Sequence, residues 1–315
     1  MRLQIYGIGA IGVGISETPA DGTARLEKVP IENYTKPGFR RRFGRLSKLL
    51  YVASCLAIED SSYEDPSALT IVTGTALGEA GVSVKLLSQI HASKGKTLSP
   101  GFVPNSVHNA PAGYLSIGQK NQSPSITVSQ GWLSAEAAVA LAQDMAGSLD
   151  QQTFLIVAGD EVDPGWIEQL REAGARDWAE ALEKEAFQEG AVALVTGVQP
   201  SGRQLGSIGA AVNRCSKKPE DIRKMLKLNR LYPGAEAHVC VRVGTGNAEW
   251  RQIVAHAVGR EVDDIIVDDV GVGTSLAGGF ATLVDRMADP TCKELLVLGN
   301  ELDDVSALHW TRTVS

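Results

Sequence analysis

The chain has 315 residues, enough to bury a large core and to form two domains or two halves of one domain. Its 30 basic and 37 acidic side chains give a formal net charge of −7. That balance argues against general nucleic-acid binding, which needs a basic face. Cys55, Cys215, Cys240 and Cys292 form no CxxC pair, so we expect neither a zinc site nor a disulfide framework. No segment reaches the ~20 continuous apolar residues of a membrane span, and we expect a cytoplasmic protein.

Short apolar, β-rich runs alternate with helical patterns along the chain. The predicted strands are residues 3–8, 69–73, 125–129, 154–158, 191–196, 206–211, 238–243, 265–267 and 295–298. The predicted helices are residues 46–58, 134–146, 166–184, 220–228, 248–258 and 275–287. Several of the strands are apolar almost throughout, as expected for strands covered on both faces. The alternation predicts an α/β architecture with helices packed on sheets.

The glycines of the first strand could be mistaken for a dinucleotide-binding turn. Gly7, Gly9 and Gly12 have the spacing of GxGxxG. The motif, however, also requires a following helix and an acidic residue about 20 positions further on. No helical pattern that leads to such an acidic residue follows the glycines here, so we expect a plain first β-strand and no nucleotide role. The candidate boundary within the chain is the Gly-, Pro- and Ser-containing segment 197–205.

A series of motifs identifies a family. Residues 104–117 read PNSVHNAPAGYLSI and are followed by GQKNQSPSITVSQG, with RRRFGRLSKL at 40–49, IVAGDE at 156–161 and VRVGTGN at 241–247. This order and spacing resembles β-ketoacyl synthases, in particular a synthase-like group of polyene and pigment pathways. The resemblance implies the thiolase fold, with two pseudo-symmetric α/β halves in five layers. It also implies an N-terminal half at 1–200 and a shortened C-terminal half at 201–315.

The resemblance also implies that the catalytic groups are missing. Condensation needs a thiolate at a helix N-terminus and two histidines that stabilise the enolate oxygen. In this sequence Trp132 stands where the family has its cysteine, while Val243 and Val272 stand at the two histidine positions. Indole has no nucleophilic atom for acyl transfer. The resemblance therefore implies a subunit without condensing chemistry, and without a metal or a cofactor.

Other polar residues near these positions leave alternatives open. Ser129 or Ser134 could act as a displaced nucleophile, but a serine nucleophile needs a base within reach. His108 is expected to be a structural histidine near the pocket or interface rather than a catalytic one. The basic cluster of Arg40, Arg41, Arg42, Arg45 and Lys48 is either a solvated face or a docking site for an acidic acyl carrier protein or a neighbouring subunit.

The expected function is that of a chain-length factor, which pairs with an active ketosynthase and limits the depth of its acyl tunnel. Such heterodimers serve type II polyketide, aryl polyene or fatty-acid-like systems. The resemblance places the following residues at the shared tunnel or the interface: Phe102, Val103, Asn105, Ser106, His108, Asn109, Ser125, Ile126, Thr127, Val128 and Ser129. The alternatives are an acyltransferase or acyl-binding enzyme that uses Ser134, and a homodimeric scaffold without a synthase partner.

Overall fold

The computed structural model describes residues 1–12, 25–61, 63–96, 99–148, 152–174, 188–199, 203–242, 247–268, 279–301 and 304–313. The strands in these residues are β1 (Leu3–Gly12), β2 (Thr70–Gly74), β3 (Ser125–Val128), β4 (Thr153–Asp160), β5 (Gly190–Gly197), β6 (Gly206–Arg214), β7 (His238–Arg242), β8 (Ile265–Asp268), β9 (Glu294–Glu301) and β10 (Asp304–Thr311). Each predicted strand overlaps one of them, and only β10 was not predicted.

The strands form two halves with the same topology. The order is β3-β2-β4-β5-β1 in the first half and β8-β7-β9-β10-β6 in the second, so equivalent strands occupy equivalent places. In the first half β2 is parallel to β3 and β4, while β5 is antiparallel to β4 and β1. The second half repeats this pattern strand for strand. A short antiparallel pairing of β1 with β6 joins the halves, and the connection between them is the stretch after β5.

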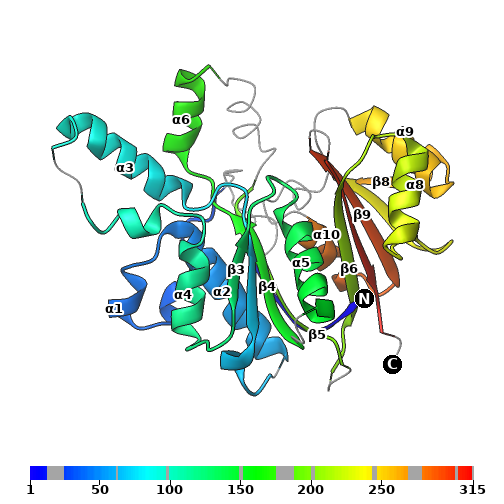
Figure 1. Cartoon of the computed structure of the whole chain (residues 1–315), viewed down its shortest axis with the longest axis horizontal. Coiled ribbons are helices and arrows are strands. Elements are labelled where there is room, and N and C mark those ends of the chain that lie inside the picture. The colour runs from blue at the N-terminus through cyan, green and yellow to red at the C-terminus, as the bar shows by residue number, and fades with distance from the viewer. Residues whose placement is uncertain are drawn as a thin grey trace.

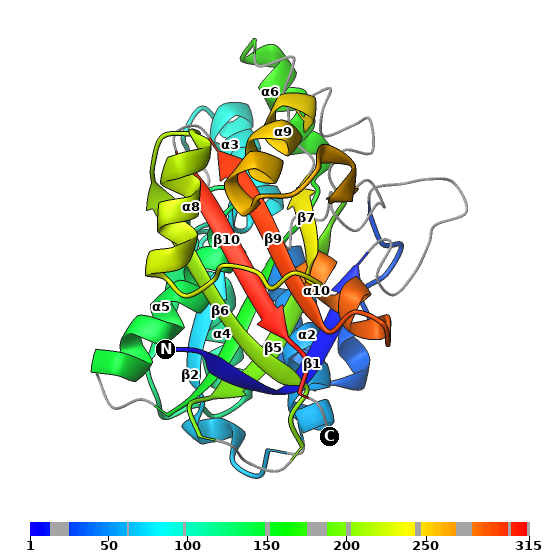
Figure 2. The same ribbon diagram turned by 90° about the vertical axis from the view of Figure 1, so that its right-hand side faces the viewer.

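Helices and sheet halves alternate as five layers (Figure 1). The helices are α1 (Pro37–Arg40), α2 (Arg45–Ser61), α3 (Ala80–Ser93), α4 (Ala110–Gly118), α5 (Ser134–Ser148), α6 (Pro164–Glu172), α8 (Pro219–Leu228), α9 (Asn247–Val258) and α10 (Gly279–Ala288). Helices α2 and α4 cover the outer face of the first half, and α8 and α9 cover that of the second (Figure 2). Helices α5 and α10 contact each other in the middle layer, where α5 touches strands of both halves.

The apolar pattern of the sequence explains why the helices pack this way. On α2 the side chains of Leu46, Leu49, Leu50 and Ala53 repeat at helical spacing and are fully buried against the sheet. Burial of each leucine contributes about 1.5–3 kcal/mol. The middle helix α5 is rich in alanine because it is buried on both sides, and its small side chains let both halves approach it.

The glycines of β1 serve helix packing. A Cβ on Gly7 would lie 2.4 Å from the carbonyl oxygen of Ala57, and one on Gly9 would lie 2.2 Å from that of Ala53. Helix α2 therefore crosses β1 in direct backbone contact, which only glycine allows. This close approach accounts for the first two glycines of the GxGxxG spacing.

Two predicted helices differ from the structure. The helix expected over 166–184 ends at Glu172, because Gly174 takes the left-handed conformation (φ +83°) that terminates helices. The prediction of one continuous helix to residue 184 is therefore wrong, and residues 175–184 lie outside the described part of the chain. Helix α10 begins at Gly279, and the first four residues of the expected segment 275–287 also lie outside it. Helices α1, α3 and α4 were not predicted.

Candidate functional site

The turn between β3 and α5 carries Trp132, the residue that the sequence resemblance aligns with the family's nucleophile. Gly131 has a φ of +52°, and this turn delivers the chain to the first residue of α5. The Ser134 hydroxyl donates to the carbonyl oxygen of Gly131 at 2.6 Å and accepts from the backbone N–H of Gln130 at 2.9 Å. The side-chain amide of Gln130 donates to Asp304 at the start of β10 (2.8 Å), so the turn is also tied to the second half.

Trp132 fills this place with an aromatic ring. It is half-buried and packs in a small apolar cluster with Leu77, Val162, Trp166 and Ile167. Its only polar atom is an N–H donor, so the side chain offers no atom for acyl transfer. The two other degenerate positions, Val243 and Val272, lie outside the described residues.

The serines near the turn differ in accessibility. Ser134 is 4% exposed, and its proton and a lone pair are both committed to backbone partners in the turn. Among the described residues, no histidine or carboxylate is hydrogen-bonded to this hydroxyl. Ser129 is exposed at the end of β3.

Strand β3 lies at the edge of the sheet. Among the described strands it pairs only with β2, so its other edge has no partner within this part of the chain. Ser125 is exposed, while Ile126, Thr127 and Val128 are half-buried. An uncovered edge of this kind presents free backbone N–H and C=O groups to another chain.

Exposed apolar side chains lie on α3, on α4 and on the segment between these two helices. Large apolar side chains that remain exposed are Leu87 and Ile90 on α3, Val103 and Val107 before α4, and Ile117 on α4, which is 65% exposed. The segments that carry them contact one another, and α4 contacts β3. We group these exposed residues with β3 and call the group the β3 face.

The predicted tunnel residues divide into two groups. Phe102 and Asn105 line a cavity, where Asn105 donates to the carbonyl oxygen of Arg42 (2.9 Å) and accepts from the Tyr114 hydroxyl (2.5 Å). The second group comprises Val103, His108 and Asn109, which are exposed, and Ser106, which is half-buried with its hydroxyl bonded to the Val103 carbonyl. The His108 ring lies beside Gly78, which has a φ of +61°.

The basic cluster of the sequence lines the same cavity, whose volume is about 720 Å³. Its cationic lining residues are Arg25, Arg41, Arg42, Arg45, Lys48 and Lys85. Arg40 belongs to the same sequence run but does not line it. Arg45 binds both carboxylate oxygens of the buried Glu189, so this member of the predicted docking cluster is engaged inside the protein.

Two buried glutamates lie at this cavity or beside it, and the sequence had assigned neither a role. Glu79 accepts from the backbone N–H (2.8 Å) and the hydroxyl of Ser47, and its other oxygen has no hydrogen-bond partner among the described residues. Glu161 accepts from the backbone N–H of Gly81 at 2.8 Å. Burial raises the pKa of both groups, and with the nearby Glu79 it raises the pKa of Glu161 to about 8.

Asp160 is the third buried carboxyl group of this region. It accepts from the backbone N–H groups of Ala76 and Leu77, each at 2.8 Å, and from the Thr75 hydroxyl. Burial raises its pKa to about 7, while these hydrogen bonds oppose the rise. Asp160 thus fixes the turn after β2. The sequence could have indicated this role, because two acidic residues end the apolar run IVAGDE.

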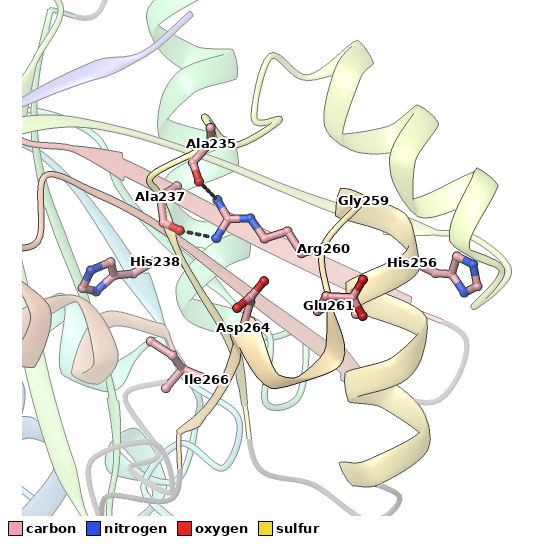
Figure 3. Close-up of a pocket in the computed structure, with 10 residues that line it drawn as sticks. Ala235, Ala237, His238, His256, Gly259, Arg260, Glu261, Asp264 and Ile266 are labelled. Carbon is pink, nitrogen blue, oxygen red and sulfur yellow. Dashed lines mark hydrogen bonds between the residues drawn. The ribbon is translucent and has the colours of Figure 1, made fainter.

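A second hollow, of about 690 Å³, lies in the C-terminal half between β7, α9 and the start of β8 (Figure 3). The guanidinium of Arg260 donates to the carbonyl oxygens of Ala237 (2.5 Å), Gly234 (2.7 Å) and Ala235 (3.0 Å). These bonds tie the turn before β7 to the end of α9, so this arginine is structural.

The described residues contain neither a metal-binding cluster nor a membrane-spanning helix. In the part of the chain that the structure describes, no three His, Cys, Asp or Glu side chains gather in a way that could hold a metal ion. Among the described helices, none combines the length and the apolar composition that crossing a bilayer requires.

The repeated strand order and the central pair of helices define a thiolase-like fold, as predicted. Residues 20–223 match the family described as β-ketoacyl synthase, N-terminal domain, which covers more than half of the chain. The chain therefore belongs to the β-ketoacyl synthase family, and the resemblance read from the sequence is confirmed.

Solved structures with the same fold cover almost the whole chain. The ishigamide ketosynthase/chain length factor aligns over 100% of both chains with 16% identity and a TM-score of 0.76. A type II polyketide ketosynthase, AntDE, solved with its acyl-carrier protein AntF, aligns over 99% of both chains with 16% identity and the same TM-score. A β-ketoacyl synthase from Burkholderia phymatum STM815 covers 99% of this chain and is itself covered completely, at 15% identity and a TM-score of 0.73. Among curated proteins, no sequence matches this chain.

Proposed function

We propose that this chain is a non-catalytic, chain-length-factor-like subunit that pairs with an active ketosynthase and shapes its acyl tunnel. The product would be a polyketide, an aryl polyene or a fatty-acid-like chain. The family match and the fold shared with a ketosynthase/chain length factor support the class. The observation that carries the proposal is Trp132, which occupies the turn before α5 where condensation requires a thiolate.

The β3 face supports pairing with a second subunit. Two related subunits can pair equivalent edge strands across a two-fold axis, and a paralogue without its own chemistry can keep that surface. Ile126 and Thr127 are β-formers that suit such a pairing. The apolar residues around β3 would lose their contact with water in the complex.

The same pairing accounts for the remaining predicted residues. His108 and Asn109 are exposed in the isolated chain and would face the partner subunit, near its tunnel. Their side chains would act by position, as part of the tunnel wall. Docking of an acyl carrier protein would use the accessible arginines of the basic cluster, Arg40, Arg41 and Arg42, rather than the ion-paired Arg45.

The pairing can be tested with substitutions in the β3 face. We expect the tagged chain to co-purify with a ketosynthase encoded beside it, and the double variant Val103→Asp and Val107→Asp to lose the partner. Leu228→Asp is the matched control, because Leu228 is an exposed leucine on α8, outside the β3 face. Retention of the partner by the double variant would contradict the proposed interface. A stable homodimer that ignores the ketosynthase would favour the scaffold alternative.

The acyltransferase alternative has no observation in its favour. The Ser134 hydroxyl is buried and bonded to the backbone on both sides, so it is neither accessible nor activated. Covalent labelling of this chain by an acyl-thioester analogue would nevertheless support that alternative.

A further inference from the structure

The cavity beside the basic cluster has more positive charge than the protein itself neutralises. Of its six cations, Arg45 and Arg25 lie near the carboxylate of Glu189. No carboxylate in the described part of the chain lies within ion-pair distance of Arg41, Arg42, Lys48 or Lys85. These four cations come from three places: the segment before α2, α2 itself and α3.

The acidic lining residues offset only part of this charge. Asp163 is the N-cap of α6, where its carboxylate accepts from the backbone N–H of Trp166 at 3.2 Å. The pKa of Glu161 is raised to about 8 by burial and by Glu79, so this group is mostly neutral at pH 7. A neutral carboxylic acid can donate a hydrogen bond to an anion. At neutral pH the cavity is therefore a cationic recess with an acid at its wall.

We propose that this cavity binds the phosphate group of a small phosphate ester. Arginine guanidinium groups match phosphate oxygens in pairs, and lysine adds a compact charge. A phosphate monoester carries about −1.5 to −2 at pH 7, which fits an excess of several positive charges better than one carboxylate does. The volume of about 720 Å³ admits a ligand of nucleotide size. The rings of Phe102 and Tyr114 offer apolar surface for the rest of the molecule.

The phosphate ester could be free or attached to a carrier protein as its prosthetic arm. Binding of the free ester needs no partner subunit. Binding of the carrier-attached ester, in contrast, depends on the proposed docking of the carrier protein. In both cases the phosphate must reach Lys48, which is half-buried, whereas Arg41 and Arg42 lie at the exposed rim. A contact that used only the surface of an acidic protein would involve the rim arginines and would not need Lys48.

The experiment is calorimetric titration of the full chain with coenzyme A and adenosine 3′,5′-bisphosphate, with adenosine as the ligand that lacks phosphate. We expect binding of at least one phosphate ester and none of adenosine. Lys48→Met and Arg42→Gln should each weaken binding at least ~10-fold, since a charge-assisted hydrogen bond contributes about 1.5–3 kcal/mol. Lys36→Gln is the matched control, because Lys36 is an exposed cation near the run but outside both the cavity and the basic cluster; it should change binding less than ~2-fold. Lys48→Arg keeps the charge and should retain binding, which separates loss of a contact from misfolding.

Titration with a carrier protein distinguishes the two sources. If the ligand is the carrier's arm, the form with the phosphate-bearing arm should bind more tightly than the form without it, and Lys48→Met should abolish the difference. Equal binding of both forms, with no binding of any free phosphate ester, would overturn the proposal in favour of a protein docking surface. No binding of any probe would also overturn it. Failure to pair with a ketosynthase would leave the free-ligand result intact.

Discussion

The substitution Glu161→Gln tests the electrostatics of the buried carboxyl group at the cavity. Burial and Glu79 raise the pKa of Glu161 from 4.5 to about 8. At ~1.4 kcal/mol per pKa unit, holding the charged form in the folded state costs about 4–5 kcal/mol. A carboxyl group whose pKa is higher in the folded state stabilises the fold fully below pH 4.5, and this contribution is lost as pH rises towards 8. Glutamine keeps the acceptor for Gly81 but never ionises.

We therefore expect the free energy of unfolding of Glu161→Gln to match the wild type near pH 4.5 and to exceed it at pH 9, by up to about 4 kcal/mol. The assay is urea unfolding from pH 4.5 to 9, with the exposed Glu64→Gln as control, whose difference from the wild type should stay flat. A difference for Glu161→Gln that is independent of pH, or that grows as pH falls, would refute the reasoning.

Three further predictions rest on single positions. Gly9→Ala would drive a methyl group into the Ala53 carbonyl, so it should lower the free energy of unfolding in urea by about 3 kcal/mol. In the control Gly38→Ala the added methyl group meets nothing within 4 Å, and the free energy of unfolding should not change. Trp132→Cys should give no condensing activity with a malonyl-loaded carrier protein, because a thiol alone lacks the family's histidines; any β-ketoacyl product would contradict this. Burial raises the pKa of Cys55 to about 12. Iodoacetamide should therefore alkylate the Cys55 thiol more than ~10-fold more slowly than a free thiol at pH 8. Reaction at the free-thiol rate would show that the Cys55 thiol is accessible.

The sequence predicted the strands well because the buried strands are apolar runs of about five residues. Strand β10 was not predicted because Ser306 and His309, although buried, interrupt its apolar pattern. His309 is accommodated by a network, with Glu294 2.7 Å from one ring nitrogen and Arg2 2.9 Å from the other. Those partners are distant in sequence, and only the folded chain brings them together.

The pseudo-symmetry of the two halves also could not be recognised from the amino-acid sequence. The topologies agree strand for strand, yet the connections differ in length. The chain takes 29 residues to pass from β4 to β5, from Glu161 to Glu189, whereas only residues 302 and 303 separate the equivalent β9 and β10. Because these insertions change the spacing of the elements, a search for a sequence repeat does not find the repeated fold.

The sequence indicated which segments carry candidate site residues, but it did not indicate which contacts those residues make. The motif around Trp132 falls on the turn before α5. The sequence left the run from Arg40 to Lys48 as a solvated face or a docking site, whereas Arg41, Arg42, Arg45 and Lys48 line a cavity. The engagement of Arg45 by Glu189 could not be foreseen, because the two residues are 144 positions apart. The roles of Glu79 and Glu161 depend on burial, which the sequence does not report.

The most direct test of the central claim is to load the co-purified complex with an acyl-thioester substrate and weigh both subunits by intact mass spectrometry. We expect a 1:1 complex in which only the partner ketosynthase gains the acyl mass, through its cysteine. This chain should keep its unmodified mass, and Trp132→Ala should leave the loading unchanged. Acylation of this chain, at Ser129, Ser134 or elsewhere, would contradict the non-catalytic role.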